Sequence, residues 1–436
     1  MSGGSAWTGA AVAAVTGGYA LFSRRLESTP VSAPMVFTGF GVLIGPIGLD
    51  VLDLGHDAGP VLTLIEAALA LMLFADAMTV RLQDMRTGGF LPLRLLAIGL
   101  PLSIGAGWLL AWPLLPGLTL WQFALLGAIL APTDAALGKT ACSNPRVPAL
   151  VRHGLNVESG LNDGLVLPFF LVFLAEIPGT VTHEEGVNGV FWRAVVLSVA
   201  LGLAIGAASG WALTFARARG WMTGEWQQVF VLAVAFCAYA VATAVDGSGF
   251  IATWMGGFAF AVALRMGGPA NGEPAGERPA ELTEYVGGLL GTLSFLVFGA
   301  VLLGPALEHL NWRIVTYAVL SLTVVRLVPV ALALAGTGMR LPTVAYVGWF
   351  GPRGLASVVF GLLLVEQHVP GLELLSRVIA FTIGLSVLLH GMSAPFFADR
   401  YGAWYDAAKA AIPGPREARG APESAVSQQS GPHRLR

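Results

Sequence analysis

The chain has 436 residues, of which 55% are hydrophobic and only 11% are charged. Soluble domains carry about 25% charged residues, so this composition excludes a soluble globular protein and indicates an integral membrane protein. The formal net charge of −2 is uninformative, and no basic tract suggests a nucleic-acid partner. The two cysteines form neither a disulfide framework nor a metal motif, and we expect no cofactor.

Apolar runs of about 17–25 residues predict thirteen transmembrane helices, so we expect an all-α membrane protein. The predicted spans are 6–22, 31–49, 58–78, 92–113, 117–138, 157–176, 191–215, 226–245, 248–266, 284–306, 312–335, 341–365 and 374–397. Residues 398–436 predict a cytoplasmic, largely disordered tail, because their final part is rich in Pro, Gly, Ser, Gln and Arg.

The positive charges orient these spans. Of the 24 Lys and Arg residues, nineteen fall in the tail or in loops on the side of Arg24 and Arg25, three on the opposite side, and two within spans. Cytoplasmic loops carry the excess of positive charge. We therefore expect a multi-pass protein of the cytoplasmic (inner) membrane, with its N-terminus outside and its C-terminus in the cytoplasm.

Two predicted spans are interrupted by proline. In the fifth span, Pro132 removes a backbone donor and clashes with the preceding turn, so we expect the helix to break near Asp134. The twelfth span has a similar interruption around Pro352. Two ordinary proline kinks are one interpretation. The other is an inverted-repeat transporter whose site lies where the broken helices cross.

The second interpretation predicts one transmembrane domain over residues 1–397. It contains two inverted halves, at about 6–178 and 226–397, linked by a helix near 191–215.

The sixth span begins with the polar stretch Glu-Ser-Gly-Leu-Asn-Asp-Gly at 158–164. Helical periodicity places Glu158, Ser159, Asn162 and Asp163 on one face. An ionised group near the bilayer centre costs roughly 2.5–3.5 kcal/mol, so this cluster predicts a function. Oxygen ligands with an unpaired carboxylate suit a small, hard cation. The alternative is a water-exposed helix start in which the Asn and Asp act as caps.

The charges within the spans do not balance. Six such side chains are present: Glu66, Asp134, Glu158, Asp163, Arg326 and Arg353. Their sum is −4 + 2 = −2, and buried charges must be paired or neutralised. Two carboxylates can pair with the arginines, which leaves two to share a cation or a proton, as an exchanger requires. From this count alone we expect Arg353 to pair with Glu66. We read Asp76, near a span end, as interfacial, and His390 as packing within the last span.

Three motifs in chain order carry a resemblance to a known family. The motifs are Ala-Pro-Thr-Asp at 131–134, the stretch at 158–164, and Gly-Trp-Phe-Gly-Pro-Arg-Gly at 348–354. Together they resemble the monovalent cation:proton antiporters, in their sodium/proton exchanger branch. The resemblance covers about residues 6–397. It implies a secondary transporter rather than an enzyme, which exchanges Na⁺ (or Li⁺ or K⁺) for H⁺ by alternating access. It also implies a six-helix core domain that carries two crossing discontinuous helices, and a panel domain that holds a homodimer.

The resemblance also implies roles for single residues. Asp163 would bind the cation and the proton, and Asp134 and Thr133 would lie at the helix crossing. Ser159 and Glu158 would flank the site. The transported Na⁺ would be held by Asp163, Asp134 and Ser159.

Further implied roles concern charge. Arg326 would pair with Glu158, and Arg353 matches an arginine late in the family's sequence. Asn162 stands where the electrogenic relatives carry a second aspartate, which is similar to the electroneutral members and implies one-for-one exchange. The family usually has proline after the Thr-Asp pair. Here Ala135 stands at that position and leaves the local geometry open.

Three other functions compete with sodium/proton exchange. A K⁺/H⁺ exchanger of the same fold stays open, because selectivity depends on site size and hydration. An intramembrane aspartyl protease could use Asp134 and Asp163, but its Gly-x-Gly-Asp signature is absent and Asn162 precedes Asp163. A cation channel would need a repeated pore element, which the sequence does not contain.

Overall fold

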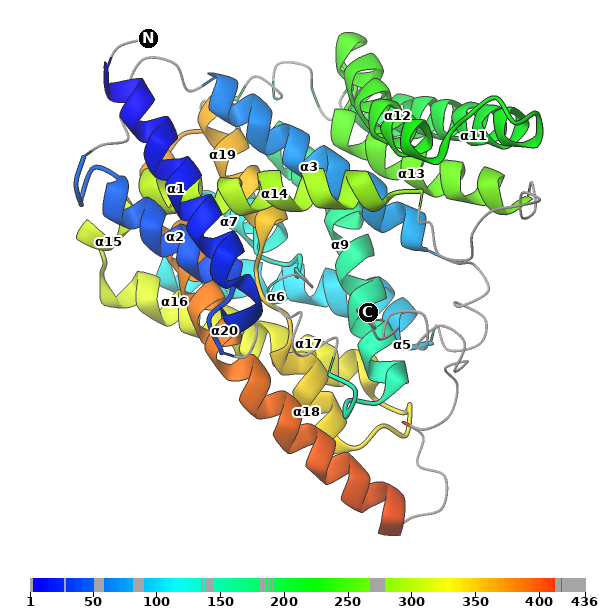
Figure 1. The fold of residues 1–436 in the computed structure, drawn as a ribbon. Helices are drawn as coiled ribbons and strands as arrows, with labels where there is room; N and C mark the ends of the chain where they lie inside the picture. Colours follow the sequence, from blue (N-terminus) through cyan, green and yellow to red (C-terminus); the bar gives the residue numbers. More distant parts are fainter. Residues whose placement is uncertain are drawn as a thin grey trace.

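The computed structural model describes residues 3–26, 29–50, 59–80, 90–134, 137, 144–180, 183, 186, 188–189, 191–266, 279–367, 369–411 and 417. Within these ranges every regular element is a helix (Figure 1). Ala135 and most of the predicted tail lie outside the described residues.

The helices of the first part of the chain are α1 (Gly3–Leu26), α2 (Ala33–Ile44), α3 (Gly59–Thr79), α5 (Phe90–Arg94), η1 (Leu95–Gly99), α6 (Leu100–Leu114), α7 (Leu120–Ile129), α9 (Ala149–Ala175), η2 (Phe191–Leu197) and α11 (Ser198–Ala218). Those of the second part are α12 (Gly224–Ala244), α13 (Gly249–Met266), α14 (Glu281–Phe298), η3 (Gly299–Leu303), α15 (Gly304–Glu308), α16 (Trp312–Leu322), α17 (Val324–Leu334), α18 (Leu341–Trp349), α19 (Leu355–Glu366) and α20 (Leu372–Ala411).

A helical segment occupies each of the predicted spans, because a bilayer leaves an apolar segment no way to satisfy its backbone except as a helix. Among the described helices, nine segments are long and apolar enough to cross a membrane by themselves. The remaining predicted spans correspond to α1, α2, α7 and the pair α18–α19, so the number thirteen stays a prediction. The chain is thus an all-helical, multi-pass membrane protein.

Two predicted helix bounds are wrong. α9 begins at Ala149 rather than near residue 157, so Glu158 lies well inside a 27-residue helix. The interpretation of Asn162 and Asp163 as helix-start caps is therefore wrong. α20 continues to Ala411 instead of ending at 397, because Tyr401 stacks on Tyr346 of α18 with ring centroids 4.3 Å apart.

α11, α12 and α13 pack together at one corner of the molecule (Figure 1). Gly202, Gly206 and Gly210 recur every fourth residue along α11, and a Cβ at any of them would collide with the backbone of α13. Small residues at this spacing let two membrane helices approach closely. α13 also contacts α3 and α9, which joins this corner to the rest of the molecule.

The fifth and twelfth spans, which contain Pro132 and Pro352, are interrupted as the sequence predicted. α7 ends at Ile129, and the chain from Ala131 to Asp134 is not helical. α18 ends at Trp349, and α19 begins at Leu355 after a non-helical stretch. The interpretation as two ordinary kinks is wrong, because a kink would leave the helix continuous. The inverted relation of the two predicted halves stays a prediction.

Candidate functional site

The two interrupted spans cross at their non-helical segments. The backbone N–H of Asp134 donates to the carbonyl of Pro352 at 2.8 Å. The Ser357 hydroxyl donates to the carbonyl of Ile129, the last residue of α7, at 2.6 Å. Both bonds satisfy backbone groups that the helix breaks release, which is the condition for irregular backbone at membrane depth.

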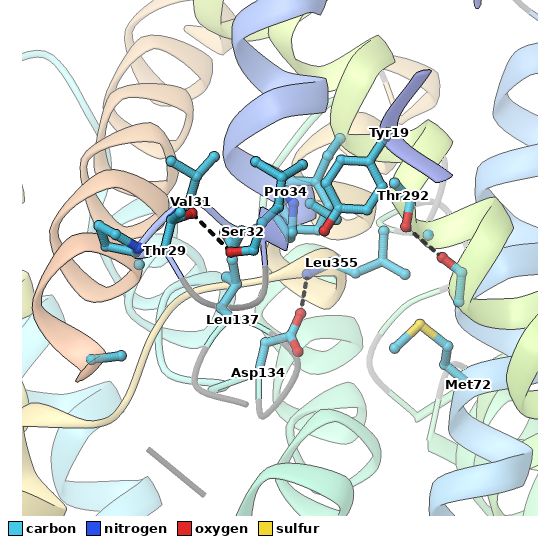
Figure 2. A pocket seen from close by; sticks show the side chains of 18 residues that line it. Tyr19, Thr29, Val31, Ser32, Pro34, Met72, Asp134, Leu137, Thr292 and Leu355 are labelled. Atoms are coloured by element: carbon cyan, nitrogen blue, oxygen red, sulfur yellow. Dashed lines mark hydrogen bonds between the residues drawn. The ribbon is translucent and has the colours of Figure 1, made fainter. Parts of the chain in front are cut away.

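Asp134 caps the second half-helix of the twelfth span. Its Oδ2 accepts a hydrogen bond from the backbone N–H of Leu355, the first residue of α19, at 3.1 Å (Figure 2). A carboxylate is stabilised at a helix N-terminus by the free N–H groups and the helix dipole. Gly354 makes this approach possible, because a Cβ there would collide with the Asp134 side chain.

Two side chains of α9 hold Thr133. The Ser159 hydroxyl donates to the Thr133 carbonyl at 2.7 Å, and Asn162 Nδ2 donates to Thr133 Oγ1 at 2.7 Å. All three side chains are buried. The predicted polar face of the sixth span therefore does meet the broken fifth span.

Asp163 and Asn162 present oxygen atoms without a protein partner. Asp163 Oδ1 and Asn162 Oδ1 are buried and accept no hydrogen bond in the described part of the chain. Asp163 interacts electrostatically with Asp134 and Asp76. Unpaired oxygen acceptors beside carboxylates are the groups that hard cations bind. On this observation, the residues present fit a small monovalent cation.

Asp76 lies beside the candidate site, although its place in the sequence did not indicate this. It lies in the last turn of α3, yet its side chain packs against Gly160 of α9 and interacts electrostatically with Asp134 and Asp163. The end of α3 meets the middle of α9 at this point, and the interfacial position of Asp76 stays a prediction. The sequence showed only a carboxylate in the last turn of an apolar span. Such a carboxylate can lie either at a binding site or at the membrane surface, and the sequence does not tell which.

The expected pair of Glu158 and Arg326 is confirmed. Arg326 Nη1 lies 2.6 Å from Glu158 Oε1, and Nη2 lies 2.8 Å from Oε2. Both side chains are buried. The pair therefore neutralises one carboxylate of α9 beside the unpaired Asp163.

The expected pair of Arg353 and Glu66 is wrong. The Arg353 guanidinium donates to the carbonyls of Gly351 at 2.8 Å and Ser321 at 3.4 Å. Glu66 instead accepts from the hydroxyl of Tyr239 on α12 at 3.0 Å. Two backbone carbonyls thus accept hydrogen bonds from Arg353, where the charge count had predicted a carboxylate partner.

α20 holds both sides of the break between α18 and α19. The backbone N–H of Arg353 donates to the Ser386 hydroxyl at 2.7 Å. His390 lies with Nε2 3.0 Å from the Trp349 carbonyl and Nδ1 3.1 Å from Ser386 Oγ. The Trp349 indole N–H donates to Ser393 at 3.0 Å. His390 thus packs within the last span, as expected, and there it fixes the crossing.

A cavity of about 550 Å³ lies beside Asp134 (Figure 2). Met72 of α3, Phe295 of α14 and Leu355 of α19 line it, and so do the connection at 29–32 between α1 and α2 and the first turn of α2. Tyr19, Thr29, Ser32 and Thr292 bring hydroxyl groups to its lining. The cavity joins the crossing to the end of α1 that carries Arg24 and Arg25.

The chain resembles characterised proteins over most of its length. A relative from Zygosaccharomyces rouxii, Na⁺/H⁺ antiporter 2, is 24% identical over 415 residues, which cover 84% of this chain and 49% of that protein. The K⁺/H⁺ antiporter NhaP2 of Shewanella baltica (strain OS223) is 26% identical over 372 residues, which cover 82% and 60% of the two chains. The chain thus spans about half the length of the curated relatives it matches.

A solved structure shares the fold. The sodium proton antiporter MjNhaP1 of Methanocaldococcus jannaschii superimposes with a TM-score of 0.72 at 18% identity, covering 92% of this chain and 98% of that one. The family model described as sodium/hydrogen exchanger, transmembrane, matches residues 11–400. The crossing, its carboxylates and this match together lead to one conclusion: the chain belongs to the sodium/hydrogen exchanger family of membrane proteins.

Proposed function

We propose that the protein is a secondary transporter that exchanges Na⁺ for H⁺ across the cytoplasmic membrane by alternating access. Its family is one of transporters rather than enzymes. Asp163 binds the cation or the proton, Asn162 and Ser159 lie beside it, and Asp134 shapes the same site from the crossing. Asp76, at the end of α3, adds a third carboxylate.

One observation carries this proposal. Among the described residues, Asp163 Oδ1 is buried without a hydrogen-bond partner, while Asp163 interacts electrostatically with two further carboxylates, Asp76 and Asp134. The two buried arginines are engaged elsewhere, Arg326 by Glu158 and Arg353 by carbonyl groups. An ionised carboxylate in low dielectric needs a counter-charge or a proton. A cation and a proton therefore bind Asp163 alternately, and this alternate binding produces the exchange.

The neutral amide of Asn162 supports a one-for-one exchange. It stands directly before Asp163, and its Nδ2 is committed to Thr133. A second carboxylate at this position would add a titrating charge and a second proton to the cycle. With one carboxylate cycling between Na⁺ and H⁺, the turnover moves no net charge.

The cavity beside Asp134 supports an access route. It extends from the crossing to the connection between α1 and α2, and four hydroxyl groups line it. The adjacent Arg24 and Arg25 put this end on the predicted cytoplasmic side. A cation therefore enters from the cytoplasm in this conformation. The homodimer, the inner-membrane location and the orientation of the termini belong to the same proposal.

K⁺/H⁺ exchange is the second candidate, because several relatives, including that of Shewanella baltica, are named K⁺/H⁺ antiporters. The two candidates use the same site, and they differ in the cation that loses its hydration most easily there.

The test uses purified protein in proteoliposomes that contain a pH-sensitive dye. Adding NaCl, LiCl or KCl outside should drive protons out of the lumen, and the cation that gives the half-maximal rate at the lowest concentration is the substrate. Asp163→Asn should abolish the signal while the protein still folds. Asp399→Asn, at an exposed carboxylate, is the matched control and should stay active. No cation-driven proton movement in the wild-type protein would refute the proposal.

A further inference from the structure

The first half-helices of the two broken spans begin in different ways. α7 has a complete capping box of its own. Thr119 Oγ1 accepts from the N–H of Gln122 at 3.4 Å, and Gln122 Oε1 accepts from the N–H of Thr119 at 2.7 Å. α18 begins after Arg340, whose side chain holds no acceptor and makes no cap bond. Because the N–H groups of a first helical turn need acceptors, α18 requires a cap from elsewhere.

Glu417 supplies this cap from beyond the end of α20. Its Oε1 accepts from the backbone N–H of Arg340 at 3.2 Å and from the Thr343 hydroxyl at 3.0 Å. Arg340 is the N-cap residue of α18, and Thr343 is the third helical residue. In a capping box, a Glu or Gln at that third position accepts from the N-cap N–H. Glu417 therefore takes the part that Gln122 has in α7.

Glu417 lies in a buried and closely packed environment. Glu417 is 3% exposed and Thr343 is fully buried. The Tyr401 hydroxyl lies 3.0 Å from Thr343 Oγ1, and its ring stacks on Tyr346 of α18 and on Trp404. A carboxylate beside a helix N-terminus also gains from the helix dipole. One end of α18 is thus held by α20 and by Glu417 together.

The other end of α18 leads into the crossing. α18 has nine residues, and isolated helices shorter than about 12–15 residues are marginal. Its last residue, Trp349, is bonded to α20, and the next residues carry Pro352 and Arg353 into the site. Loss of the cap would therefore fray a large part of a helix that holds the crossing in place.

We propose that Glu417 is a positioning residue for the ion site, which completes the capping box of α18 and thereby stabilises the crossing. This goes beyond the proposed transport function, and its effect on transport rests on that function. Release of Glu417 lowers the fraction of molecules with an intact crossing. The apparent affinity for the cation falls in proportion, because only the competent fraction binds.

Hydrogen exchange tests the cap without any assay of transport. Removing a cap typically costs about 1 kcal/mol, so Glu417→Ala should speed amide exchange in Leu341–Trp349 about fivefold. Glu417→Gln keeps the acceptor and should have a smaller effect. Asp406→Ala, at an exposed residue of α20, is the matched control and should change nothing.

A rescue separates capping from other roles. Arg340→Ser gives α18 an N-cap of its own, so it should restore slow exchange in the Glu417→Ala background. Unchanged exchange in α18 of Glu417→Ala overturns the proposal. The same holds for faster exchange that extends equally to α7, because that pattern means general destabilisation.

Transport kinetics test the coupling to the site. In proteoliposomes with equal amounts of folded protein, Glu417→Ala should raise the half-maximal cation concentration by up to about fivefold, and Arg340→Ser should reverse the change. Faster exchange in α18 with an unchanged half-maximal concentration overturns the positioning role. An inactive wild-type protein with the expected exchange pattern instead refutes the proposed transport and leaves the cap in place.

Discussion

Arg326 of α17 holds Glu158 of α9 through two parallel hydrogen bonds, with Nη1–Oε1 at 2.6 Å and Nη2–Oε2 at 2.8 Å. Such bidentate pairs are among the strongest hydrogen-bonded contacts in proteins. The pair joins the helix that carries Asp163 to the span before the second broken helix. It leaves Asp163 as the α9 carboxylate that is available for a cation.

Arg326→Ala should destabilise the protein strongly. Removing one partner of a buried pair costs about 3–5 kcal/mol, because the other charge stays buried without compensation. Arg377→Ala is the control, since its pair with Glu373 is exposed and is worth about 0–1 kcal/mol. Thermal unfolding in detergent measures both changes. The double variant Glu158→Leu/Arg326→Met should recover stability, and wild-type stability in Arg326→Ala alone would contradict the structural role.

Gly354→Ala should disrupt the crossing. The added methyl group would collide with the Asp134 side chain, which caps α19, and overpacking of this kind costs about 1–3 kcal/mol. Gly39→Ala on α2 is the control, because a Cβ there meets no atom within 4 Å. Gly354→Ala should lower both the temperature of thermal unfolding and the rate of cation-driven proton movement. Wild-type transport in that variant would show that the Asp134 cap is dispensable.

The proposed competition at Asp163 predicts a pH dependence. A proton on the carboxylate excludes the cation, so raising the pH should lower the half-maximal cation concentration, by about tenfold per pH unit where the proton dominates. Asp163→Glu should retain weak exchange with the same trend. Initial rates over a pH series at symmetrical pH measure this. A half-maximal concentration that does not change with pH would argue against a shared site.

One-for-one exchange also predicts insensitivity to membrane potential. With Asn162 neutral, each turnover moves one positive charge in each direction. Proteoliposomes clamped with valinomycin and potassium should show the same rate of Na⁺-driven proton movement at every imposed potential. A rate that rises steeply with potential would require a second titrating group, and Asp76 would be the first candidate.

Asp76→Asn should weaken cation binding without unfolding the protein. Asp76 interacts electrostatically with Asp134 and Asp163, so its charge raises the local attraction for a cation. We expect a several-fold rise in the half-maximal cation concentration, with little change in thermal stability. Asp399→Asn, at an exposed carboxylate, should leave both quantities unchanged. An unchanged half-maximal concentration in Asp76→Asn would place this carboxylate outside the site.

The sequence by itself determined the helical class, the position of the apolar segments and the two interruptions. These properties are local, because each apolar segment in a bilayer must satisfy its own backbone as a helix, and the two interruptions lie at Pro132 and Pro352. The polar face of α9 is local too, since it follows from helical periodicity. The pair of Glu158 and Arg326 could be predicted because the family resemblance implied the partner of Glu158.

Only the tertiary structure decided which groups meet across helices. Arg353 has carbonyl partners instead of Glu66: the Gly351 carbonyl lies in the break of its own span, and the Ser321 carbonyl lies near the end of α16. Asp76 comes close to the candidate site because the end of α3 packs on the middle of α9, and Glu417 caps α18 although 77 residues separate it from Arg340. A charge count has no information about distance. Contacts between distant segments depend on how the helices pack, and that packing is set by the whole chain.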